Sequence, residues 1–104
     1  MTEAAKIEMK TGNLYLSNQD RARSFSQIES LVLLRDGDDL LIVPVRFAAA
    51  GGYILKIRNS AGDRVVVATD FFPVNNFDDD EPRVLNATWD ETRAALRIPA
   101  LFNN

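Results

Sequence analysis

The sequence contains neither cysteine nor histidine. Without cysteine, the chain can form no disulfide, no zinc–thiolate site and no thiol nucleophile. Without histidine, it lacks the side chain most often used as a general base near neutral pH, which is also the commonest metal ligand. Serine triads, Cys–His pairs and histidine-based zinc or haem sites are therefore excluded within this chain, whereas chemistry based on carboxylates or lysines is not.

Long apolar runs, internal repeats and low-complexity segments are missing as well. No stretch is long and apolar enough to span a bilayer, and the first six residues lack the charged and apolar regions of a secretory signal peptide. We therefore expect a soluble protein that is cytoplasmic or part of an intracellular or viral assembly. No motif indicates a cofactor, so none is expected.

What the sequence does contain fits one small domain. The 104 residues are 46% hydrophobic and 26% charged, which is typical of a folded domain rather than a disordered tail. We expect a single β-rich domain over residues 1–104, with residues 99–104 as a candidate extended tail. A formal net charge of −3 disfavours nucleic acid and anionic membranes as partners.

Turn residues between short apolar runs predict antiparallel hairpins. Residues 36–39, Asp-Gly-Asp-Asp, separate the apolar runs 31–34 and 40–43, which predicts a hairpin over 31–43 with strands buried on both faces. A shorter hairpin is predicted over 7–16, where Thr-Gly-Asn forms the turn cluster.

A further hairpin is predicted over 53–69, with strand 53–58 paired along its length to strand 64–69. Its loop is rich in turn-forming residues. In this hairpin Tyr53, Leu55 and Ile57 share one face, and Val65 and Val67 are expected to point inward.

Three segments complete the chain. Residues 83–89 alternate as a strand, with Leu85, Ala87 and Trp89 on one face. Residues 90–98 fit either a short helix capped by Asp90 or a turn followed by a strand, and the β-rich context favours the strand. Residues 20–30 fit a short helix or an irregular crossing.

These elements predict a mainly β fold: a small antiparallel sandwich, roll or barrel of six or seven short strands, with one or two short helices at most. The alternative is an α+β fold in which a few strands pack against one helix.

Two clusters of carboxylates are the remaining candidates for chemistry: Asp36, Asp38 and Asp39, and then Asp78, Asp79, Asp80 and Glu81. Neither fits a calcium-binding EF-hand loop, because Phe47 stands at the twelfth position of one and Arg83 at the sixth position of the other. We interpret both clusters as solvated loops and expect no metal site. A carboxylate-dependent enzyme is the least favoured function.

A basic strip is a candidate nucleic-acid site. Lys56 and Arg58 share one face of the predicted strand 53–58, and Arg64 begins its partner. Such a strip beside aromatic rings can hold single strands. However, Tyr53 is predicted on the opposite face and the chain is acidic, so we expect these cations to keep the sheet surface soluble.

Two apolar segments are candidates for binding a partner: a loop with Phe71, Phe72 and Phe77, and a tail with Leu101 and Phe102. Apolar side chains in loops and tails either cap the core or contact another surface. Phe77 is followed by the acidic run 78–81, which either steers a basic partner or stays solvated.

The sequence thus predicts a non-enzymatic structural or protein-interaction subunit of an oligomeric assembly, with a protein partner or a second copy bound by the phenylalanine segments. The alternative is a β-domain that binds a small molecule or carbohydrate, with Tyr53 and Trp89 as stacking platforms.

Overall fold

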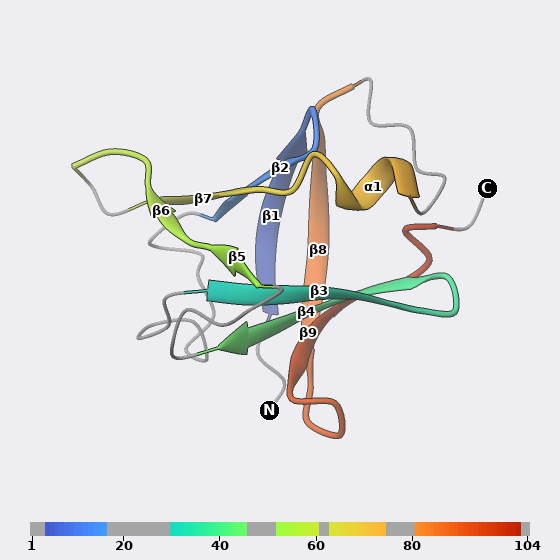
Figure 1. Ribbon diagram of the computed structural model, residues 1–104. Coiled ribbons are helices and arrows are strands. Elements are labelled where there is room, and N and C mark those ends of the chain that lie inside the picture. Colours follow the sequence, from blue (N-terminus) through green and yellow to red (C-terminus); the bar gives the residue numbers. More distant parts are fainter. Residues whose placement is uncertain (1–3, 17–29, 46–51, 61–62, 75–80, 103–104) are drawn as a thin grey trace.

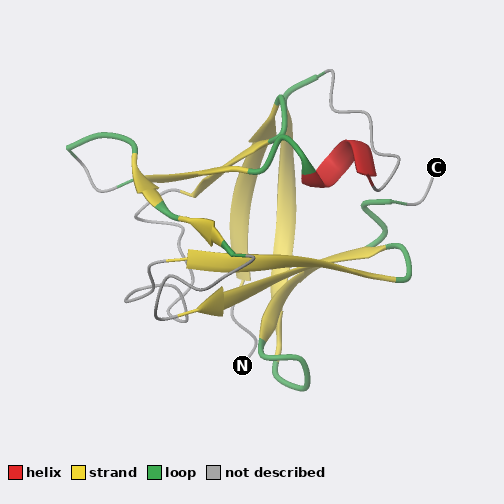
Figure 2. Cartoon of the chain, in the orientation of Figure 1, coloured by secondary structure: helices red, strands yellow, loops and turns green. Residues whose placement is uncertain are grey.

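The computed structural model describes residues 4–16, 30–45, 52–60, 63–74 and 81–102. Its elements are β1 (Ala4–Lys10), β2 (Asn13–Leu16), β3 (Ser30–Asp36), β4 (Asp39–Val45), β5 (Tyr53–Ile54), β6 (Lys56–Ile57), β7 (Arg64–Val67), α1 (Phe71–Val74), β8 (Arg83–Asp90) and β9 (Ala95–Ile98). The fold is mainly β, as predicted, and its only helix among the described residues is a single turn (Figure 2). None of the described helical segments has the length and apolar character needed to cross a membrane.

The described residues form nine strands rather than the six or seven predicted, and all of them belong to one antiparallel sheet, in the order β5-β3-β4-β9-β8-β1-β2-β7-β6. The strands at the two ends of this order, β5 and β6, follow each other in the chain with Leu55 alone between them. The sheet therefore closes on itself almost completely and forms a small barrel. Figure 1 shows β3 and β4 running across the direction of β1 and β8, as in orthogonally packed sheets.

One bent strand, made of β5 and β6, closes this barrel. Tyr53 and Ile54 pair with β3, whereas Lys56 and Ile57 pair with β7. Between them Leu55 is only 4% exposed and belongs to the core, and its carbonyl accepts a hydrogen bond from Nη1 of Arg64 at 3.3 Å. The predicted continuous pairing of 53–58 with 64–69 is therefore wrong. A closed barrel needs a strand that passes from one half to the other, and this requirement divides the predicted strand in two.

The predicted pairing is confirmed in two hairpins, and in each of them a tight turn that contains glycine connects the two strands. Thr11 and Gly12 have φ of 51° and 81° between β1 and β2, the positive pair of a type I′ turn. A Cβ atom on Gly12 would lie 2.8 Å from Cα of Thr69, so this turn also needs glycine for a close approach. Gly37, with φ of 62°, opens the two-residue turn between β3 and β4.

The end of the chain follows the strand alternative. Thr88, Trp89 and Asp90 pair with β9, so residues 90–98 form a hairpin rather than a helix. The turn between these strands covers residues 91–94, and Ala94 has a φ of 50° there. In contrast, a short helix, α1, begins at Phe71, where a loop was predicted. The uncertain region 20–30 lies outside the described residues except for Ser30, which begins β3.

The barrel encloses one apolar core, and its inward-facing residues correct one prediction. On β7, Val66 is fully buried while Val67 is 44% exposed, so the expected inward orientation of Val65 and Val67 is wrong by one residue. Three consecutive valines give no polar alternation from which the inward face could be predicted. On β4 the predicted burial of both faces is confirmed, because Leu41 is buried between the core residues Leu40 and Ile42. On β3 the same prediction is wrong, because Leu34 lies on the outward face and is 44% exposed.

The closing strand provides a test of this architecture. We expect Leu55→Ala to lower the free energy of unfolding by about 2–5 kcal/mol, since it removes a buried side chain at the point of closure. Ile57→Ala is the matched control in the same strand: Ile57 is 68% exposed, and its truncation should change stability by less than about 0.5 kcal/mol. Urea denaturation followed by circular dichroism measures both. Equal effects of the two substitutions would contradict the closure at Leu55.

Candidate functional site

Two of the phenylalanines predicted to bind a partner, Phe72 and Phe102, are buried in the core, and Phe71 packs against it. Phe72 is buried, and its ring meets that of Phe71 edge to face at a centroid distance of 5.3 Å. The ring of Phe71 also lies 6.2 Å from that of Phe102, which is buried too. In this position, where α1 meets the C-terminal segment, the rings cap the core rather than form an open apolar patch. Phe77 lies outside the described residues.

The C-terminal segment is held against the turn between β3 and β4. The backbone N–H of Phe102 donates to the carbonyl of Asp38 at 2.9 Å, and that of Ala100 donates to Oδ1 of Asp39 at 2.8 Å. The guanidinium of Arg35 lies 4.7 Å from the centre of the Phe102 ring. Leu101 is half-buried and packs against the core. The segment is therefore fastened by contacts within the chain.

The two rings predicted as stacking platforms are also engaged within the chain. Trp89 packs against the core from the inward face of β8. Tyr53 packs there as well, and its hydroxyl donates to Oδ1 of Asp70 at 3.0 Å. Burial, with a smaller effect from the Asp70 carboxylate, raises the pKa of Tyr53 above its ordinary value. Both residues thus have structural roles at the places predicted for a ligand.

Two carboxylates of the first acidic cluster, Asp36 and Asp39, surround Arg97 on β9 together with Asp90 at the end of β8. Its guanidinium lies 2.7 Å from Asp39, 2.8 Å from Asp90 and 3.1 Å from Asp36. These contacts join the turn after β3 to the end of β8. Among the described residues no group of three or more carboxylates is arranged to hold a metal ion, because a guanidinium occupies the place where these carboxylates meet.

The register of the strands creates a different site on the outer wall of the barrel. Glu8 on β1 lies opposite Val84 of β8 on one side and Tyr15 of β2 on the other. Tyr15 in turn lies opposite Val65 of β7. Successive residues of a strand point to opposite faces, and the next residue, Met9, is fully buried, so this row faces outward.

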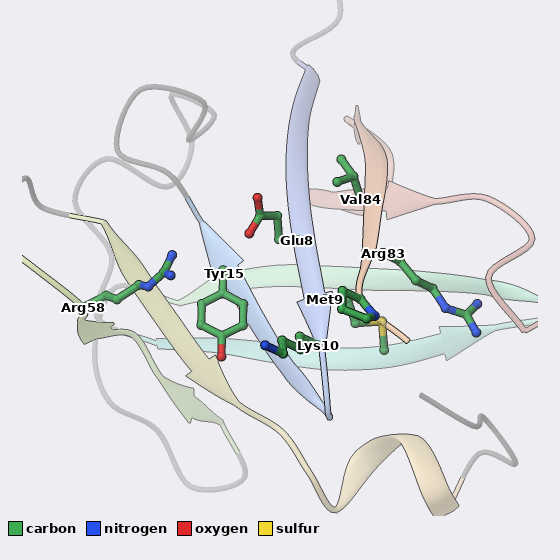
Figure 3. A pocket seen from close by; sticks show the side chains of 8 residues that line it. Glu8, Met9, Lys10, Tyr15, Arg58, Arg83 and Val84 are labelled. Carbon is green, nitrogen blue, oxygen red and sulfur yellow. The ribbon is translucent and has the colours of Figure 1, made fainter. Parts of the chain in front are cut away.

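Around this row lies a half-open pocket of about 380 Å³, which we call the Tyr15 groove. Figure 3 shows Arg58 on one side of Tyr15, and Arg83 and Val84 on the other side of β1. The groove is lined by Glu8, Met9, Lys10, Tyr15, Arg58, Pro82, Arg83 and Val84.

Three cations and one carboxylate set the charge of the Tyr15 groove. Lys10, Arg58 and Arg83 against Glu8 give a formal charge of +2 at its lining, within a chain whose net charge is −3. The guanidinium of Arg58 lies 4.6 Å from the centre of the Tyr15 ring, which orients it at the edge of the groove. Val84 is 61% exposed and adds an apolar surface. The groove can therefore bind a group that is both anionic and apolar.

Sequence reasoning considered Arg58 as part of a basic strip but missed the Tyr15 groove. It sought an aromatic partner for Arg58 on the same strand, whereas Tyr15 comes from β2, two strands away in the sheet. A usable signal was present in the turn at Thr11–Gly12. A two-residue turn there places Glu8 opposite Tyr15, with Lys10 on the same face.

The carboxylates around Arg97 predict a loss of stability in acid. Hydrogen bonds from the backbone of Ala100 and from Arg97 lower the pKa of Asp39, and Arg97 lowers that of Asp90. Each carboxyl binds its proton more weakly in the folded than in the unfolded chain. The stability that each ionised carboxylate adds to the folded state is therefore fully present above the ordinary pKa of 3.8. It is lost as the pH falls through the lowered pKa.

We expect the melting temperature to fall below about pH 4, and to fall less steeply in Arg97→Gln, where the two pKa values return toward 3.8. Arg93→Gln is the control, since the Arg93 side chain contacts only Asp36 among the described carboxylates, at 3.5 Å. Thermal melts at a series of pH values measure the slopes. Identical slopes for the wild type and Arg97→Gln would contradict this assignment.

The C-terminal segment gives a second test. A chain ending at Ile98 should lose about 3 kcal/mol of stability, since it lacks the buried ring of Phe102, but its mass in light scattering should not change. A chain ending at Phe102 keeps the ring and should match the full-length protein. If the shorter chain instead lost its oligomeric mass while keeping its stability, the segment would belong to an interface.

Comparisons with protein-family models, with curated proteins and with solved structures find no match to this chain. Its function is therefore argued from the geometry of the Tyr15 groove and the chemistry of the residues that line it.

Proposed function

We propose that this protein is a non-enzymatic interaction subunit of an oligomeric assembly made of copies of this chain, with the Tyr15 groove as its contact surface. The observation that supports the proposal is the groove itself. It combines cations, an aromatic ring and exposed apolar side chains on the outer wall of a closed barrel.

The residue types favour recognition over catalysis. The eight lining residues include no serine, threonine, cysteine or histidine, and the one carboxylate, Glu8, shares the lining with three cations and with no second acid. Tyrosine, methionine and arginine are enriched in protein interfaces, and tyrosine and arginine are common among the residues that dominate binding energy. The groove therefore resembles the centre of an interface more than an active site.

The surroundings of the groove provide further contact area. A stable protein contact buries roughly 800 Å² on each partner, more than one small groove offers. Val84 lines the groove, and Val67 lies one row away, opposite Asn13, which is itself opposite Lys10. Both valines are largely exposed, at 61% and 44%. A partner seated on the groove can therefore extend over the outer faces of β8, β1, β2 and β7.

The charges indicate what a partner should present. A lining with a formal charge of +2 favours an acidic segment, and the apolar side chains favour one with an apolar residue beside its charges. Glu8, in the middle of the groove, would repel the continuous phosphates of a nucleic acid. These features support a protein segment as the occupant.

Sedimentation velocity over a series of protein concentrations tests the proposal. We expect the wild type to self-associate as its concentration rises, and Lys10→Glu to need at least about tenfold more protein, since it reverses a charge in the groove. Arg93→Glu is the control: Arg93 is exposed in the turn between β8 and β9, and it belongs neither to the groove nor to the outer faces of β8, β1, β2 and β7. A wild type that stays monomeric at about millimolar concentration would overturn the proposal. So would equal effects of the two substitutions.

A further inference from the structure

The chain carries a segment whose chemistry matches the Tyr15 groove. Phe77 directly precedes Asp78, Asp79, Asp80 and Glu81, which places one large apolar ring beside four acids. The groove offers the opposite arrangement: cations at Lys10, Arg58 and Arg83, and apolar surface at Tyr15, Pro82 and Val84. Acids of the segment can pair with Lys10 and Arg58, while its ring packs on the apolar lining.

We propose that the occupant of the Tyr15 groove is the segment 77–81 of a second copy of this chain. This inference rests on the proposed function, because it identifies the surface that docks into the groove during self-association. The balance of charge supports it. The segment carries four negative charges, and the groove lining carries a formal charge of +2. Such complementarity guides association and penalises the wrong partner.

The position of segment 77–81 in the chain supports a symmetric dimer in which each copy places this segment in the groove of the other. Its last residue, Glu81, is exposed and directly precedes Pro82, which lines the groove of its own chain. Each segment therefore starts from the rim of a groove. When two copies face each other across a two-fold axis, each segment reaches the rim of the other groove, and the same contact forms twice.

This arrangement also accounts for how a small groove can hold an assembly together. One groove of about 380 Å³ takes one or two side chains, too few for a stable contact by itself. A two-fold pair uses two grooves and the outer faces of β8 and β1 between them. Exposed Val84 lies at the centre of that surface, on the strand next to Glu8.

A peptide copy of the segment tests this inference directly. A fluorescent peptide covering residues 75–83 is titrated into the full-length protein and followed by anisotropy. We expect saturable binding that weakens at least about tenfold in Lys10→Glu but not in Arg93→Glu. A control peptide with asparagine in place of Asp78, Asp79 and Asp80 keeps the phenylalanine and removes three charges. It should bind at least about tenfold more weakly than the acidic peptide.

Complementation in the full chain gives the decisive result. The triple variant D78N/D79N/D80N keeps its groove but loses the acidic segment, whereas Lys10→Glu keeps the segment but damages the groove. Each alone should stay monomeric at concentrations where the wild type associates. A mixture of the two should associate at lower concentration than either variant alone but more weakly than the wild type in sedimentation velocity, since one of the two groove contacts remains intact.

The outcomes separate this inference from the proposed function. If the triple variant associates like the wild type while Lys10→Glu does not, the groove serves assembly but segment 77–81 is not its occupant. If neither substitution affects association, the proposed function fails as well. A third outcome is that the triple variant is monomeric and binds the acidic peptide more tightly than the wild type does at concentrations where the wild type is monomeric. In that case segment 77–81 occupies the groove of its own chain, and its docking into a second copy is overturned.

Discussion

The closure of the sheet at Leu55 is the constraint on which the rest of this structure depends. One short strand supplies both ends of the strand order, pairing with β3 through Tyr53–Ile54 and with β7 through Lys56–Ile57. The change of partner leaves the carbonyl of Leu55 outside both ladders, and the guanidinium of Arg64 satisfies it. The Leu55 side chain fills the core at the same point. Packing and hydrogen bonding therefore fix the bend together.

Few residues close the sheet: β5 and β6 contribute two residues each. The aromatic residues of α1 and of the C-terminal segment complete the core beyond it. Phe71 contacts both Phe72 and Phe102, so segments about thirty residues apart in sequence are joined through one ring. The chain thus uses within its own core three of the phenylalanines that its sequence suggested for a partner. The surface that remains for recognition is the outer wall of the strands.

The sequence predicted local features well and distant pairings poorly, for identifiable physical reasons. Hairpins around Gly12 and Gly37 were predictable, since a tight turn with positive φ fixes the pairing of its neighbours. The inward face of β7 was not, because Val65, Val66 and Val67 are equally apolar. The division at Leu55 was hidden too, since it depends on β3, which lies far away in the sequence. The Tyr15 groove combines both kinds of information: the turn aligns Glu8 with Tyr15, but only the closed sheet brings Arg58 to Tyr15.

The same closure explains why the Tyr15 groove lies on a firm support although its charged side chains are exposed. Tyr15 belongs to β2, which is paired on both edges, with β1 and with β7. Met9, at the base of the groove, is part of the buried core. Arg58 follows β6, and its backbone N–H bonds to the carbonyl of Asp63 at 2.7 Å, which holds the end of the hairpin beside Tyr15. Because these backbone positions are fixed before a partner arrives, little conformational entropy of the backbone is lost on binding there. A barrel without histidine or cysteine can in this way use its strand register and its closure to place charge and apolar surface side by side on its outer wall.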